Sequence, residues 1–66
     1  MDKKQQVISA LMRKIENCRS EAKYYYEKAE SDPESSESAT WKVLQGYMEG
    51  RASAFQWALD TITEEL

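Results

Sequence analysis

The stretch ESDPESSES, residues 30–38, divides the chain into two halves and decides how it folds. It holds the only proline, Pro33, and no other apolar residue. Proline interrupts a helix, while serine and aspartate favour turns and helix caps. We therefore expect a polar turn over about residues 31–36, between a helix over about 3–30 and a second helix over about 37–64.

The start of the second helix has more than one candidate. Asp32, Pro33 and Glu34 predict an N-cap, a proline at the first helical position and an acid in the first turn. Ser35 and Ser36 are alternative caps later in the same segment. The start therefore stays open by about four residues.

The first helix is predicted to have one apolar face. Apolar side chains recur at alternating steps of three and four residues, which gives a stripe about 140° wide. Its members are Ile8, Leu11, Ile15, Cys18, Ala22, Tyr25 and Ala29, with Val7, Met12 and Tyr26 at its margins. Such a helix needs one partner surface.

The second helix is predicted to have two apolar faces. The stronger one comprises Trp41, Leu44, Met48, Ala52, Phe55, Leu59, Ile62 and Leu66. The other lies roughly 150° away on a helical wheel. Its residues are Val43, Gly46, Tyr47, Gly50, Ala54, Trp57 and Ala58. If the first helix folds back on the stronger face, Tyr26 lies near Trp41 and Ile15 near Ala52, and the second face stays uncovered.

The weaker face contains a small residue at every fourth position, namely Gly46, Gly50, Ala54 and Ala58. Glycine inside a helix costs roughly 0.5–1 kcal/mol relative to alanine, so close packing should offset it. We expect the seven residues of this face to form the interface between two hairpins, giving a dimeric four-helix bundle. Two alternatives are that the groove receives the first helix of the same chain, and that a glycine acts as a kink or hinge.

The composition favours association over other means of stabilising a small fold. A chain of 66 residues makes one domain, residues 1–66, and buries only roughly 60% of its unfolded surface. One cysteine, Cys18, excludes an internal disulfide, and the absence of histidine removes the common zinc patterns. We expect no cofactor and no metal, and a reduced Cys18 in the core.

Charge and hydropathy exclude several partners. The net charge is −3 and the bases are dispersed among acids, which is unlike the clustered basic surface of a nucleic-acid binder. There is neither a membrane-length apolar run nor the apolar segment of a signal peptide. We therefore expect no nucleic acid and no membrane partner, and a cytoplasmic protein.

Three individual side chains have specific expectations. Consecutive aromatics on a helix point about 100° apart, and Tyr24 is predicted to lie opposite the apolar stripe, either simply exposed or as a contact for a partner protein. Arg19 and Arg51 are predicted to extend their stems over the core and meet acids at its edges.

Two resemblances bear on function. The segment YYEKAESDP with the later Trp41, Leu44, Tyr47 and Gly50 resembles the junction of two tetratricopeptide repeats, but Gln45 stands where that pattern has glycine. That family would imply a break near Gly50, whereas we expect a continuous helix. In length and layout the chain is similar to helical-hairpin co-chaperones of type III secretion needle subunits and to short accessory proteins of bacteriophages and mobile elements.

The expected function is that of a non-catalytic module that self-associates and binds or regulates a protein partner, as a bacterial or phage inhibitor or chaperone-like adaptor does. No base stands beside a nucleophile in the sequence, so no enzyme is predicted. One alternative is an acidic nucleic-acid mimic that blocks a DNA-binding protein, which would depend on Glu30, Glu34 and Glu37. Another is a small-ligand binder in a bundle core bordered by Arg19 or Arg51 and Tyr26.

Overall fold

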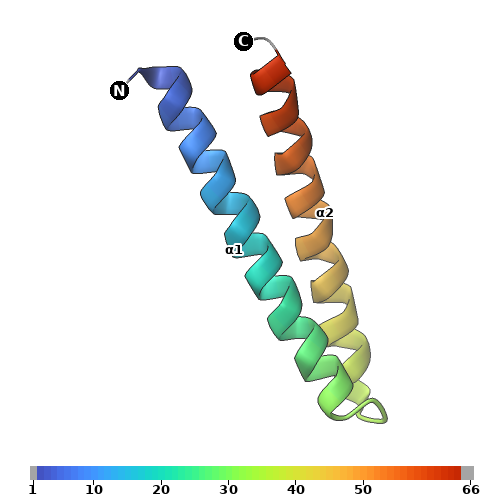
Figure 1. The fold of residues 1–66 in the computed structure, drawn as a ribbon. Helices are drawn as coiled ribbons and strands as arrows, with labels where there is room; N and C mark the ends of the chain where they lie inside the picture. Colours follow the sequence, from blue (N-terminus) through green and yellow to red (C-terminus); the bar gives the residue numbers. More distant parts are fainter. Residues whose placement is uncertain (1, 65–66) are drawn as a thin grey trace.

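Two antiparallel helices make up the protein in a computed structural model that describes residues 2–64 (Figure 1). Helix α1 spans Lys3–Ser31 and helix α2 spans Ser36–Glu64. The turn lies at one end of the hairpin and both ends of the chain at the other, so the molecule is elongated, with extents of 49 × 18 × 11 Å. The predicted all-α hairpin is confirmed. The bounds of both predicted helices are within one residue of the observed bounds. Leu66, which was predicted on the stronger face of the second helix, lies outside the described residues.

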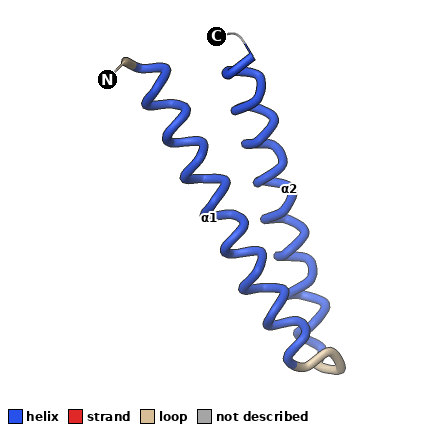
Figure 2. Tube along the Cα trace, viewed as in Figure 1, coloured by secondary structure: helices blue, strands red, loops and turns tan. Residues whose placement is uncertain are grey.

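The turn is shorter than the polar segment that contains it (Figure 2). Helix α1 ends at Ser31, and Ser35 caps α2, since its Oγ accepts a hydrogen bond of 3.1 Å from the backbone N–H of Glu37. The prediction that Asp32 caps the second helix is therefore wrong, and the alternative at Ser35 is correct. A helix starting at Pro33 would leave one residue to carry the chain across the 8–10 Å that separates packed helices.

A buried serine completes the end of α1. The carbonyl of Ala29 would ordinarily accept from the backbone N–H four residues later, but that residue is Pro33, which has no N–H. The hydroxyl of Ser38, in the first turn of α2, donates to this carbonyl instead at 3.2 Å. Ser38 is 4% exposed and Ala29 is 1% exposed, so water does not compete for the bond. The hydrogen bond therefore joins the two helices where the chain reverses.

The two predicted core stripes face each other. Helix α1 buries Ile15, Cys18, Ala22 and Ala29, and α2 buries Met48 and Ala52. The other members of the two stripes within residues 2–64 are half-buried, namely Ile8, Leu11, Tyr25, Trp41, Leu44, Phe55, Leu59 and Ile62. Cys18 is a free, buried thiol, as expected.

The predicted neighbours across the interface differ in part from those observed. Ala52 packs in a cluster with Cys18, Ala22 and Met48, whereas Ile15 borders a hollow together with Leu59. Likewise the ring that stacks on Trp41 is that of Tyr25. The expected neighbour, Tyr26, is half exposed. The pattern of each helix identifies its buried stripe but leaves the axial offset between the stripes to side-chain packing.

The helices approach closely near the turn and diverge toward the ends of the chain (Figure 1). Small side chains occupy the interface near the turn, among them Ala22, Ala29 and Ser38, and permit this approach. Farther from the turn the facing residues are larger, with Leu11 and Ile15 on α1 and Leu59 on α2. Near the turn, small residues therefore stand beside the stacked rings of Tyr25 and Trp41, and larger aliphatic side chains lie where the helices diverge.

We predict that Ser38→Ala lowers the free energy of unfolding by roughly 1–3 kcal/mol, because it leaves the buried carbonyl of Ala29 without a donor. Urea denaturation followed by circular dichroism measures the change. Ser9→Ala, an exposed serine in α1, is the matched control and should be neutral or slightly stabilising. Equal stability of the two variants would contradict the role of the hydrogen bond.

We further predict that Ala22→Leu destabilises the hairpin by about 1–3 kcal/mol, since the larger side chain forces apart helices that touch at this level. Ala10→Leu is the control, because Ala10 is exposed on the same helix. Thermal unfolding of both variants tests the prediction, which fails if Ala22→Leu melts at or above the wild-type temperature.

Candidate functional site

The outer face of α2 is defined here as Val43, Gly46, Tyr47, Gly50, Ala54, Trp57 and Ala58, the residues predicted to form an interface between hairpins. Helix α1 does not cover it. Val43 and Trp57 are each 71% exposed and Tyr47 is 58% exposed. Gly46, Gly50 and Ala54 are exposed as well, and Ala58 is half-buried.

The two glycines of this face have open space in front of them. A Cβ added at Gly46 or Gly50 would meet nothing within 4 Å, apart from the backbone of its own helix. The alternative that the small-residue groove receives the first helix of the same chain is therefore wrong. Helix α2 also continues through both glycines without interruption. This continuity is as expected, and it differs from the break near Gly50 that the tetratricopeptide-repeat pattern implies.

Three aromatic rings pack together at the turn end of the hairpin. Tyr25 stacks on Trp41 with ring centroids 5.8 Å apart. Tyr24 meets Tyr25 and Trp41 edge-on, at 5.6 and 6.5 Å. Tyr24 is exposed as predicted, but its ring also reaches Trp41 of α2, because a long aromatic side chain can extend toward the neighbouring helix. Tyr24 is still 52% exposed, and its contact with a partner protein stays a prediction.

One flank of the hairpin is lined by cations that lie over aromatic rings. The guanidinium of Arg51 lies 5.6 Å from the ring centroids of both Tyr47 and Phe55. The ammonium of Lys14, from α1, lies 5.9 Å from the same Phe55 ring. Arg51 does extend along the core as expected, but its charge is stabilised by the negative faces of two rings. These contacts connect Tyr47, on the outer face of α2, to Phe55 in the core.

The opposite flank of the hairpin is hollowed. A depression of about 440 Å³ is bordered by Arg19 of α1 and by Trp57, Glu49 and Asp60 of α2, among others. The two carboxylates accept hydrogen bonds from glutamines of their own helix, Gln45 at 2.9 Å and Gln56 at 3.0 Å. Arg19 borders the same depression as these acids, and its contact with them stays a prediction. Since Trp57 belongs to both surfaces, this depression adjoins the outer face of α2.

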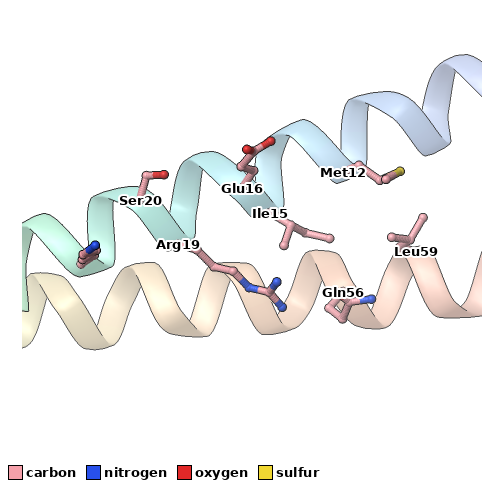
Figure 3. Close-up of a pocket in the computed structure, with 8 residues that line it drawn as sticks. Met12, Ile15, Glu16, Arg19, Ser20, Gln56 and Leu59 are labelled. Carbon is pink, nitrogen blue, oxygen red and sulfur yellow. The ribbon is translucent and has the colours of Figure 1, made fainter.

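Between the diverging helices the same flank has a second and larger hollow, of about 500 Å³. It is bordered by Met12, Ile15, Glu16, Arg19, Ser20 and Lys23 of α1 and by Gln56 and Leu59 of α2 (Figure 3). The sequence pattern indicated that Arg19 lies within an apolar stripe, but it did not reveal the hollow. That hollow exists because the helices diverge, and the divergence depends on both stripes together.

Two further findings bear on the possible sites. Within residues 2–64 no three histidine, cysteine or carboxylate side chains gather as a metal site would require, and neither described helix is long and apolar enough to cross a membrane. No protein-family model, curated protein or solved structure matches the chain.

Proposed function

We propose that this protein is a non-catalytic interaction module that self-associates through the outer face of α2 and in that form binds or regulates a protein partner. The observation that carries the proposal is the exposure of Val43, Tyr47 and Trp57 around two glycines with open space in front of them. The assembly we propose is a dimeric four-helix bundle of cytoplasmic accessory type, comparable in layout to the bacterial and phage hairpin proteins noted above.

The glycines argue for an occupant of this face. In an exposed helix each glycine costs roughly 0.5–1 kcal/mol relative to alanine. Packing within the hairpin does not require glycine at these two positions, since a Cβ at either one would be free of contacts. A second helix crossing at close range would use the space, because small residues on the i, i+4 ridge let two backbones approach.

The exposed area supports the same conclusion. The chain exposes 5041 Å². Globular monomers of 7.7 kDa expose about 4,300 Å² by area scaling, so the hairpin has about 700 Å² of surplus. A standard protein interface covers about 800 Å² on each partner. One copy packed on the outer face of α2 would therefore bring the exposed surface close to the globular value.

The large side chains on this face are of the kind that dominate binding energy. Tryptophan and tyrosine are enriched among the residues that contribute most to protein interfaces. Trp57 and Tyr47 lie on either side of the glycine positions, so a partner helix in the groove would contact both rings. The ring of Tyr47 is held in place by Arg51, which reduces the conformational entropy lost on binding.

We predict that each of the substitutions Gly50→Ala and Gly50→Leu favours folding of the hairpin but disfavours its assembly into a dimer. Both substitutions fit the isolated hairpin and favour helix formation, whereas each fills the groove that a second copy would enter. The wild-type chain should therefore be a dimer in multi-angle light scattering, and Gly50→Leu a monomer with unchanged helix content.

Ala10→Leu, which adds the same side chain on the exposed surface of α1, is the control and should leave the dimer intact. A wild-type chain that stays monomeric at the highest attainable concentration would refute self-association. A Gly50→Leu variant that keeps the mass of the dimer would also refute the proposed interface, since the groove would then make no contact with a second copy.

A further inference from the structure

The hollow of about 500 Å³ between α1 and α2 has two chemically different ends (Figure 3). Toward the ends of the chain its lining is apolar, with Met12 and Ile15 on α1 and Leu59 on α2. Toward the turn it is cationic, with Arg19 and Lys23 four residues apart on the same side of α1. The hollow extends about 16 Å along α1, from Met12 to Lys23.

Its cationic end is available to an external anion. Figure 3 shows Arg19 extending toward α2, whereas Glu16 and Ser20, which also border the hollow, project from the other side of α1. The nearest acids of α2, Glu49 and Asp60, border the adjoining depression and each already accepts a hydrogen bond from a glutamine.

The apolar end is open to solvent and has a defined floor. Ile15 is 4% exposed and forms part of that floor, while Met12 is 57% exposed at the rim. Leu59 projects from α2 toward α1 (Figure 3). An unbranched chain laid in this space would cover Met12 and Leu59, and it would reach the two bases without crossing the outer face of α2.

We infer that this hollow binds the free anion of a medium-chain alkyl carboxylate, with its chain along Met12, Ile15 and Leu59 and its carboxylate at Arg19 and Lys23. The planar fork of arginine matches both oxygens of a carboxylate, and the lysine adds a second donor. The size of the hollow is within the 300–1,000 Å³ range of small-molecule sites. Binding here does not depend on self-association, since the hollow and the glycine groove are different surfaces.

Isothermal titration of the full-length chain with decanoate, below its micelle concentration, tests the site. The double variant Arg19→Gln with Lys23→Gln should weaken binding about tenfold or more, because it removes two charge-assisted hydrogen bonds. The control is Arg13→Gln with Lys3→Gln, which changes the net charge equally at exposed positions outside the hollow. It should change the affinity less than about twofold.

Two further probes separate the head group from the chain. The uncharged analogue 1-decanol should bind both double variants equally, and Met12→Gln should weaken decanoate and 1-decanol alike. Affinity should rise about fourfold for each methylene added between octanoate and decanoate. The site is refuted if decanoate binds only as micelles, or if the two double variants weaken binding equally, which would reflect overall charge.

A last measurement distinguishes this inference from the proposed function. The decanoate affinity of the Gly50→Leu variant should equal that of the wild type whether or not either chain dimerises. An affinity that falls as the wild-type concentration rises would mean that a second copy occupies the hollow, and would overturn the inference of a carboxylate site.

Discussion

A hairpin of two helices has a single helix–helix interface, and this constraint underlies every other feature of the protein. Helix α1 has one apolar stripe and buries it against α2, whereas α2 has apolar residues on two opposite faces. One neighbour can cover only one of those faces. Val43, Tyr47 and Trp57 are consequently left in contact with solvent, although they lie in the middle of a long and regular helix.

The turn shows how a polar segment can stabilise a fold. Three serines form hydrogen bonds with backbone groups at the helix ends. Ser31 donates to the carbonyl of Lys28, Ser35 accepts from the N–H of Glu37, and Ser38 donates to the carbonyl of Ala29. Pro33 makes the last of these necessary, because it removes the donor that a continuing helix would provide. The residue that stops α1 thus creates the acceptor that anchors α2.

The helices lie closest near the turn, where Ala22, Ala29 and Ser38 are buried between them. A hollow of about 500 Å³, bordered by Ile15 and Leu59, lies where they diverge. The two flanks of the resulting wedge differ chemically. On one, Lys14 and Arg51 lie over the ring of Phe55, and the hollow that they border is smaller, about 180 Å³. On the other, Arg19 borders open space, which is why a ligand site is inferred there and not on the first flank.

The sequence by itself determined the two helices, the stripe that each buries and the face of α2 that stays uncovered, because helical periodicity depends only on residues three and four apart. Tertiary structure decided the features that depend on contacts between the two helices. Ser35 and Asp32 are comparable caps locally, and the later start is favoured by the distance that the chain must cross between the helices and by the hydrogen bond of Ser38 to Ala29. The ring of Tyr24 also meets that of Trp41 across the interface although Tyr24 is half exposed, and Arg51 lies over the rings of Tyr47 and Phe55 on its own helix. The axial offset and the hollow beside Ile15 arise from the combined shapes of both stripes, which no single helix contains.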